Sequence, residues 1–446
     1  MMKMMVMLLF MLIFLLVNNK VMFFYNIIYL MGFFYLFMVM MKEDIYFMIS
    51  IYFGLDLYSY FMVLLSFWIL GLMFMTISEN NNKNFIYLGK LFVFLIILII
   101  LMMFFFSLNL LLFYLMFELS LFPMFIIIVY WGLNYERLSA AYYLLMYMMF
   151  ISLPLYIYLI KLLKLKGSFD LILLMIIKVS FSLSIWDYLI LFMAFYIKLP
   201  VFMFHVWLPK AHVEAPVYGS MILAAVLLKL GGYGLLRFLK MFLFITLKFN
   251  YMMFSIGMIG SLMLSLICLI QIDMKKLVAY SSIVHMNMLM CSLLTLTKLG
   301  FISSYILMIS HGLCSSGLFF MVNLFYERSL SRLMFLNKGM LNLFFSLSMG
   351  WFILCMSNFS FPFSLNFFSE IFMIIVIMNW EIMMMIMVMM ICFFSSAYSL
   401  YLYSYICHGF LYFEEKYYMI YFKDMMILLI HLYPLVLFII NLNLFY

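Results

Sequence analysis

Charge is scarce in this sequence of 446 residues. Only 9% of the residues are Asp, Glu, Lys or Arg, whereas 71% are hydrophobic, and the mean hydropathy is +1.27. No connection between the apolar runs is long enough to build a soluble core, which excludes a water-soluble domain. The apolar runs reach about twenty residues and do not alternate with polar ones, so they are helices and not barrel strands. The sequence predicts an all-α polytopic membrane protein with a single membrane domain, 1–446.

The sequence also lacks the ligand patterns of redox centres. Its six cysteines include no C-x-x-C pair, which disfavours iron–sulfur or zinc ligation and favours buried, inert thiols. The segment KLGGYG, with Gly231, Gly232 and Gly234, does not complete a dinucleotide fingerprint, and its small residues instead favour close helix packing. No P-loop and no haem-binding pair is present. We expect this chain to bind no flavin, haem, iron–sulfur cluster, quinone or metal.

About fourteen apolar runs are long enough to cross a hydrocarbon core of roughly 30 Å. They lie near 4–18, 21–41, 55–78, 88–106, 108–130, 140–160, 185–208, 214–240, 250–271, 275–296, 300–326, 343–378, 380–407 and 425–445. The first run has no small-residue cleavage site and no Arg- and Ser-rich character, so we expect a membrane helix and not a targeting segment. The net charge of +8 fits loop lysines beside anionic lipid headgroups better than a nucleic-acid surface.

Alternate loops carry unequal numbers of basic residues. The richer face includes Arg137, Lys210, Lys275, Lys276, Arg328 and Arg332. Because basic loops stay on the side of synthesis, this face is expected to be the matrix or cytoplasmic side.

A few ionisable residues interrupt the apolar runs. The isolated charges are Glu118, Lys198, Lys229 and Glu370, and the histidines inside spans are His285 and His311. A charge at mid-membrane costs at least about 2.5–3.5 kcal/mol on insertion scales, so such residues usually face partners or water and mark ion paths. The alternatives are a structural ion pair for the charges and a satisfied core hydrogen bond for the histidines. The cargo favoured by these residues is a proton or another small cation.

Two of the charged spans contain a proline. Pro200 follows Lys198 by two residues, and Pro362 precedes Glu370 by eight. Proline removes a backbone donor and clashes with the preceding turn, and broken helices beside midplane charges are a recurring device of transporters. Spans 4–8 and 9–13 fit a pair of inverted repeats, although the residues of the two halves are too dissimilar to establish one.

The segment HVWLPKAHVEAP is crowded with titratable groups for so apolar a chain. His205 lies about two helical turns beyond Lys198 toward the basic face, and His212 is expected in the loop that follows. Histidine titrates near neutral pH and can relay a proton in either tautomer. We interpret the segment as a proton entrance held by a rigid corner, with solvated loop histidines as the alternative.

Several segments together resemble the chain 4 family of mitochondrial NADH–ubiquinone oxidoreductase, respiratory complex I. They are FYLMFELSLFP, YWGLNYERLSA, the long segment from AFYIKLP through HVWLPKAHVEAP to KLGGYG, DMKKLVAYSSIVHM, MISHGLCSSGLFF and NLFYERSLSR. The resemblance runs from about residue 50 to 405, and HVWLPKAHVEAP followed by KLGGYG is its most specific part. Related proteins include two sister antiporter-like chains of the complex and the Mrp-type sodium/proton antiporters.

The resemblance implies fourteen helices, two inverted five-helix repeats (about 88–240 and 250–407) with broken helices 7 and 12, and flanking helices at 1–78 and 425–445. It also implies proton pumping driven by quinone reduction in other subunits. The matching positions are Glu118 in the fifth helix, Lys198 at the broken seventh, Lys229 in the eighth, His285 and His311 on the central axis, and Glu370 in the broken twelfth. The twelfth span departs from the family, because Phe363 replaces a second proline and Ser369 a glycine.

The implied setting is the mitochondrial inner membrane, among other membrane-arm subunits, accessory subunits and phospholipids such as cardiolipin. FMN, iron–sulfur clusters and ubiquinone are expected in other subunits, and the lack of a transit peptide implies mitochondrial encoding. Glu118 is expected to control whether Lys198 keeps its proton, which otherwise moves toward Lys229 and Glu370. The competing functions are a freestanding Mrp-type cation/proton antiporter and a structural spacer in which the buried charges are expendable.

Overall fold

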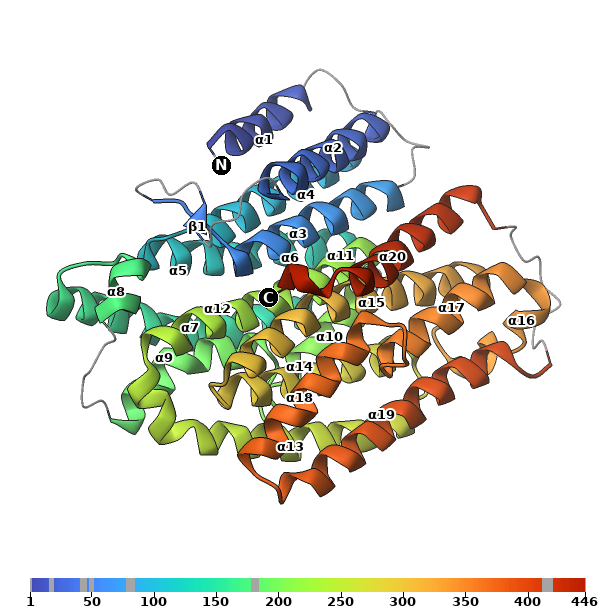
Figure 1. Ribbon diagram of the computed structural model, residues 1–446. Coiled ribbons are helices and arrows are strands. Elements are labelled where there is room, and N and C mark those ends of the chain that lie inside the picture. The colour runs from blue at the N-terminus through green and yellow to red at the C-terminus, as the bar shows by residue number, and fades with distance from the viewer. Residues whose placement is uncertain are drawn as a thin grey trace.

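The computed structural model describes residues 2–15, 20–40, 46–47, 52–77, 85–132, 134–177, 184–410 and 420–445 (Figure 1). Predicted span ends at 16–18, 41 and 78 lie outside these ranges. The first half of the chain contains α1 (Met2–Phe14), α2 (Val21–Met40), β1 (Tyr46–Phe47), β2 (Leu55–Asp56), α3 (Leu57–Thr76), α4 (Phe85–Phe106), α5 (Leu110–Leu119), α6 (Leu121–Trp131), α7 (Arg137–Lys166), α8 (Leu171–Ile177), α9 (Ile185–Lys198) and α10 (Trp207–Glu214).

The second half continues the helical pattern. It contains α11 (Val217–Ile222), the π-helical turn η2 (Leu223–Leu227), α12 (Leu228–Met241), α13 (Leu243–Ile270), α14 (Met274–Leu294), α15 (Lys298–Ser329), η3 (Met334–Asn337), α16 (Met340–Leu343), α17 (Phe345–Asn358), α18 (Leu365–Trp380), α19 (Met384–Cys407), α20 (Phe422–Ile440) and η4 (Leu442–Phe445). The strands β1 and β2 form a short antiparallel ribbon that the sequence did not predict.

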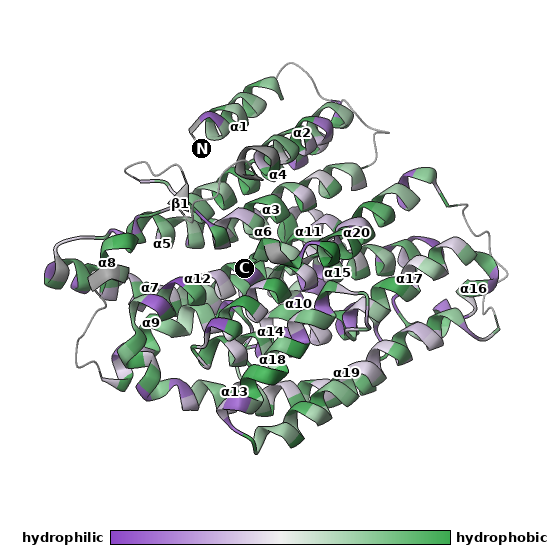
Figure 2. Cartoon of the chain, viewed as in Figure 1, coloured by the Kyte–Doolittle hydropathy of each residue, from purple (hydrophilic) through white to green (hydrophobic). Residues whose placement is uncertain are grey.

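The prediction of an all-helical membrane bundle is confirmed. Within the described ranges, ten helices are long and apolar enough to cross a membrane. The number is eleven if Met334–Leu343 and Phe345–Asn358, which meet at a bend of 119°, are counted together as one span. Shorter apolar helices occur at Lys3–Phe14, Val21–Leu36 and Leu365–Trp380. Figure 2 shows hydrophobic residues along nearly all of these helices, with hydrophilic residues mainly near their ends and at a few interior points.

One predicted span differs from the structure in its length. The run 140–160 is part of the 30-residue helix α7, which continues to Lys166 and ends at Gly167 in the left-handed conformation that glycine adopts readily. The predicted breaks in the seventh and twelfth spans are present: 185–208 is divided between α9 and the start of α10, and 343–378 between α17 and α18. Both divisions occur at the predicted prolines, where the backbone loses a donor.

The loops predicted to share the basic face lie together. The Asn134 side chain donates a hydrogen bond to Glu214 Oε1 at 3.1 Å, and Lys275 Nζ donates to the Ala215 carbonyl at 3.3 Å. A backbone bridge also pairs Asp273 with Leu333. These contacts join the loops after α6, α10, α13 and α15 at one end of the bundle, as alternating spans require.

A buried ion pair holds the opposite end of α12. Arg237 pairs with Asp56, the residue that caps α3, and its guanidinium also donates to the Tyr233 hydroxyl. Tyr233 in turn donates to the Phe105 carbonyl at the end of α4 at 3.3 Å. Separating Arg237 from Asp56 would leave an uncompensated buried charge, which is costly. The network therefore holds α12 against α3 and α4.

A proline inside α20 is compensated from a neighbouring helix. Pro434 has no N–H, so the Ile430 carbonyl four residues earlier loses its helical donor. Trp68 of α3 supplies the missing donor, with its indole N–H 3.1 Å from that carbonyl. The contact joins α20 to α3 across most of the sequence.

This compensation predicts a coupled effect of two substitutions. Trp68→Phe should lower the free energy of unfolding by about 1 kcal/mol because the Ile430 carbonyl is left without a donor. In a Pro434→Ala background the restored backbone N–H can fill that role, so the same substitution should cost much less. Heat-induced loss of the assembled protein, measured for both singles and the double, tests this. An equal cost of Trp68→Phe in both backgrounds would contradict it.

Candidate functional site

The carboxylate of Glu118 lies at a break between two short helices. Pro123 stands in the first turn of α6, and the chain changes from α5 to α6 at Ser120. Glu118 is 9% exposed, and neither of its carboxylate oxygens has a hydrogen-bond partner among the described residues. A buried carboxylate without donors is costly unless water or a mobile cation reaches it.

Lys198 is the last residue of α9, and it points toward the same break. Pro200 ends the helix, and the ammonium is buried with only 2% of the residue exposed. Its Nζ donates to the Phe117 carbonyl at 2.8 Å and to Ser120 Oγ at 3.4 Å. Glu118 and Lys198 therefore flank one helix break and interact electrostatically, but they do not reach salt-bridge distance. The structure therefore does not contain a direct salt bridge between Glu118 and Lys198.

The glycines of KLGGYG bring α12 against α9, as the sequence predicts. A Cβ atom added to Gly231 would lie 2.9 Å from the Phe195 carbonyl oxygen and 3.0 Å from Lys198 Cβ. Gly234 leaves room for the Phe195 ring in the same way. Gly231 therefore sets how closely the lysine backbone approaches α12.

Lys229 lies at the start of α12, directly after the π-helical turn η2. Its residue is fully buried, and its Nζ contacts the Ala224 carbonyl in that turn and His311 Nδ1 at 3.0 Å. Single π turns inside α-helices frequently accompany functional sites because they open the regular hydrogen-bond ladder. The side chains of Lys229 and His311 are thus in direct contact.

From His311 the polar groups continue to Glu370. The rings of His311 and His285 have centroids 5.3 Å apart, and His285 Nδ1 lies 3.4 Å from Glu370 Oε1. Tyr398 of α19 reaches the other nitrogen of His285 at 3.5 Å. Of the six ionisable residues that interrupt the apolar runs, four lie in one row: Lys229, His311, His285 and Glu370.

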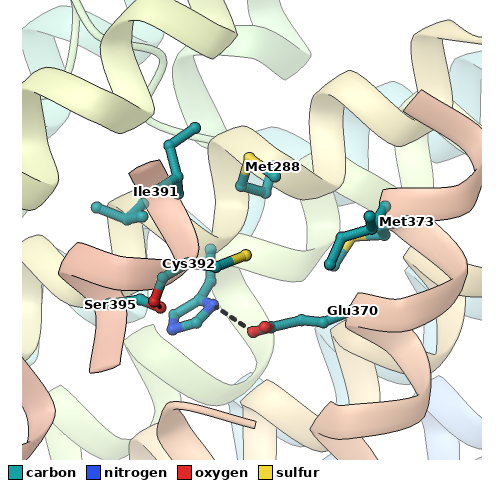
Figure 3. Close-up of a pocket in the computed structure, with 9 residues that line it drawn as sticks. Met288, Glu370, Met373, Ile391, Cys392 and Ser395 are labelled. Atoms are coloured by element: carbon teal, nitrogen blue, oxygen red, sulfur yellow. Dashed lines mark hydrogen bonds and ion pairs between the residues drawn. The ribbon is translucent and has the colours of Figure 1, made fainter. Parts of the chain in front are cut away.

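The end of this row opens into a small cavity of about 20 Å³, enough for a single water molecule. Figure 3 shows Glu370 reaching toward the pocket, with a dashed line for its ion pair and with Met288, Met373, Ile391, Cys392 and Ser395 around it. The lining is mostly apolar, so the carboxylate and histidine are its main polar groups.

The structure does not bring Lys198 and Lys229 together. Gly231 contacts Lys198, and Lys229 lies two residues earlier on the same helix, which is about 200° around its axis. Lys229 accordingly faces His311 on α15 while Gly231 faces α9. The candidate residues therefore form two clusters on different sides of α12.

His212 is not in a loop, and this part of the prediction was wrong. Residues Trp207–Glu214 form α10, where Pro209 occupies the first turn and its missing N–H is tolerated. His212 is fully buried and stacks on Phe319 of α15, with ring centroids 4.4 Å apart and an interplanar angle of 3°. Both of its ring nitrogens lack partners among the described residues.

His205 does remain in the connection between α9 and α10. Its ring stacks on Phe202 at 5.6 Å and faces Tyr280 of α14 at 6.3 Å. Trp207, two residues further, donates its indole N–H to the Ile197 carbonyl at 3.3 Å and so fixes the corner after Pro200. His205 therefore sits at the edge of the bundle, and His212 sits inside it.

The break in the twelfth span has a backbone that a proline pair cannot form. Phe363 has φ of 74°, and Ser360 has φ of 59°. Proline fixes φ near −65°, so a second proline at position 363 is incompatible with this conformation. The predicted break at Pro362 is present, with a backbone that allows Phe363 but not proline at the next position.

Sequence reasoning missed several buried polar residues because they carry no charge at neutral pH or lie in apolar surroundings. They are Ser152, Asn287, Asn366 and His431, each at most 1% exposed. The only signal was a polar residue inside an apolar run, such as Asn366 four residues after Pro362. No group of three His, Cys, Asp or Glu side chains arranged to hold a metal occurs within the described ranges.

Two family profiles match the chain. One, described as NADH:quinone oxidoreductase/Mrp antiporter, TM, covers residues 107–396, and the other, described as NADH-ubiquinone oxidoreductase chain 4, amino terminus, covers residues 1–106. The curated NADH-ubiquinone oxidoreductase chain 4 of Aedes aegypti is 46% identical over 419 residues, with 92% of this chain and 91% of that one covered. The chain 4 protein of Rhipicephalus sanguineus is 40% identical over 399 residues, with coverages of 88% and 89%.

Solved structures share the fold. A chain of respiratory complex I from Thermus thermophilus with bound NADH superposes with a TM-score of 0.82 at 20% identity, covering 92% of this chain and 89% of that one. A chain of the Mrp complex from Dietzia gives 0.81 at 13% identity, with coverages of 90% and 78%. Because the profiles and the curated relatives agree over nearly the whole length, the chain belongs to the NADH–ubiquinone oxidoreductase chain 4 family, the antiporter-like membrane subunits of respiratory complex I.

Proposed function

We propose that this chain translocates protons through the row Lys229–His311–His285–Glu370 while other subunits of complex I transfer electrons from NADH to ubiquinone. The observation that carries the proposal is the sequence of contacts in that row, at 3.0 Å between Lys229 and His311 and 3.4 Å between His285 and Glu370. All four side chains can gain or lose a proton, and each neighbour lies within reach directly or through one water.

Unpartnered polar atoms support an internal water route. Buried polar groups in proteins are nearly always paired or bound to water. Glu118, His212 and Asn287 each have buried side-chain atoms without a partner among the described residues. Waters at these positions would connect the two clusters around α12, which the protein side chains alone leave apart.

Glu118 and Lys198 act as the control element. Glu118 carries the opposite charge to Lys198 and lies at the same helix break, where the Phe117 carbonyl and the Ser120 hydroxyl accept hydrogen bonds from the ammonium. Because the two are close but not in contact, a movement or neutralisation of Glu118 changes the proton affinity of Lys198. Moving a unit charge across the membrane costs about 2.3 kcal/mol per 100 mV, so the energy has to come from the redox subunits.

We also propose that protons enter from the end with the basic loops. His205 stands at that edge, and His212 lies deeper in the bundle, stacked on Phe319 of α15, the helix that also carries His311. With this placement the proposed entrance leads to Lys229. The hypothesis from the sequence placed the entrance next to Lys198. Pro209 and Pro216 hold the helix α10 and the start of α11 in place.

The proposed setting is the inner mitochondrial membrane, with the gene in the mitochondrial genome. Proposed partners are the neighbouring antiporter-like chains, accessory subunits and phospholipids such as cardiolipin. FMN, iron–sulfur clusters and ubiquinone belong to other subunits, because this chain offers no ligand pattern for them. We further propose that 88–240 and 250–407 are inverted repeats, which fits a broken span in each half. A freestanding Mrp-type antiporter is less well supported, since the curated relatives are complex I chains.

A first prediction concerns the pair Glu118 and Lys198. Glu118→Gln should lower NADH–quinone turnover by about tenfold or more, similar to Lys198→Ala, because both changes remove the control of proton release. The double variant should be little worse than either single. Turnover and proton pumping per assembled complex are the measurements.

A purely structural ion pair gives the opposite pattern in the same experiment. The singles would then lose assembly, and removing both charges would restore it. Singles that assemble and pump normally would contradict both the control role and the structural role.

A second prediction concerns Glu370. Glu370→Gln keeps the size and hydrogen bonding of the side chain but cannot take a proton, so proton pumping and coupled turnover should fall while the complex still assembles. Proton-to-electron ratios in sealed vesicles measure this. Full pumping by the variant would remove Glu370 from the path.

A third prediction uses the close approach at Gly231. Gly231→Ala places a methyl group 2.9 Å from the Phe195 carbonyl oxygen, so α9 and Lys198 have to move, at a cost of about 1–3 kcal/mol. Turnover per assembled complex should fall severalfold. Gly89→Ala is the matched control, because its methyl group would lie 3.8 Å from Trp131, an ordinary contact. Equal turnover in the two variants would show that the spacing at Lys198 is unimportant.

A further inference from the structure

The connection between α17 and α18 is strained and needs an external restraint. The chain leaves α17 at Asn358 and enters α18 at Leu365, and Ser360 and Phe363 between them both have left-handed φ values. Residues other than glycine rarely adopt this conformation and keep it only where the surroundings hold them. In a membrane bundle the restraint has to come from the protein itself.

Asn366 joins the two halves of the broken span. It is the second residue of α18 and fully buried, and its Nδ2 donates to the Ser357 carbonyl in the last turn of α17 at 2.7 Å. The amide of Ser360 reaches the same carbonyl at 3.3 Å, but from within the break. The hydrogen bond from the Asn366 side chain is therefore shorter than the one from the Ser360 amide. It is also the bond that crosses from one helix to the other.

The same contact extends to the helix that carries His311. Ser357 Oγ lies 3.0 Å from Cys314 Sγ, and Cys314 is one turn after His311 on α15. Asn366 precedes Glu370 by four residues, so both side chains lie on one face of α18. The position of Asn366 therefore fixes the height and rotation of Glu370 relative to the histidines.

The side-chain oxygen of Asn366 takes no part in the bond across the break. This oxygen, Oδ1, is buried and has no partner among the described residues. A buried amide oxygen without a donor is the place where an internal water is expected. The titratable groups that face Glu370 are His285 from α14 and Cys392 and Tyr398 from α19, so a water held by Asn366 would add a further proton carrier on the α18 side.

We propose that Asn366 is a positioning residue for proton transfer at Glu370. Its Nδ2 bond across the break holds Glu370 3.4 Å from His285, and its Oδ1 binds a water on the face of α18 that carries Glu370. The proposal rests on the role of Glu370 given above.

The test compares Asn366→Leu with Asn250→Leu in the assembled complex. Asn250 is a matched control on α13, because it is 2% exposed, donates to the Leu294 carbonyl at 2.6 Å and also has an unpartnered Oδ1, but it lies outside the proton row. Asn366→Leu should lower turnover and protons pumped per assembled complex by about three- to tenfold, the equivalent of one lost buried hydrogen bond. Asn250→Leu should reduce only the amount of assembled complex.

Asn366→Asp is the second test variant, to be used if Asn366→Leu fails to assemble. A carboxylic acid can donate to the Ser357 carbonyl only while it is protonated, so turnover relative to the parent complex should fall as the pH rises. A merely structural role predicts a ratio that does not change with pH. Asn250→Asp is the control for general effects of a new acid.

Glu370→Gln is measured in parallel. If it is impaired while Asn366→Leu behaves like Asn250→Leu, or while the Asn366→Asp ratio is independent of pH, the positioning role is overturned and the proposed function stands. If Glu370→Gln pumps normally, the role of Glu370 fails, and the positioning role fails with it.

Discussion

In a membrane, an interrupted helix leaves backbone carbonyls that need a donor from the protein. This chain meets the requirement with side chains from other helices. Trp68 donates to the carbonyl that Pro434 frees, Trp207 donates beside the break at Pro200, and Asn366 donates across the break at Pro362. Each contact joins two elements, so the breaks tie the bundle together instead of loosening it.

Two of the buried lysines, Lys198 and Lys229, belong to the same pattern. Lys198 donates to the last turn of α5, and Lys229 to a carbonyl in the π-helical turn η2. A carbonyl dipole stabilises an ammonium without neutralising it, so these lysines are held in place yet remain able to release a proton. A full contact with a carboxylate would favour the charged form much more strongly. The absence of such a contact between Lys198 and Glu118 is therefore what makes control by Glu118 physically reasonable.

The buried polar groups divide into the pair Glu118–Lys198 and the row Lys229–His311–His285–Glu370 because α12 stands between them. The glycines on one side of this helix admit α9, and Lys229 on the other side contacts His311. Arg237 and Asp56 anchor its far end. A proton passing from one cluster to the other requires water around α12, and the unpartnered atoms of His212 and Asn287 are suitable places for it.

The helical membrane class, the breaks at Pro200 and Pro362 and the isolated charges could all be predicted from the residues, because hydropathy, proline chemistry and the cost of a buried charge are local properties. The partners of these residues depend on how the helices pack. The tertiary structure placed His212 inside the bundle, put Lys198 and Lys229 on different sides of α12, and gave Asn366 its hydrogen bond across the break. The order of apolar and polar residues along the chain shows that a polar side chain lies within a membrane span. The rotation and packing of neighbouring helices decide which group it meets, and those depend on residues far away in the chain.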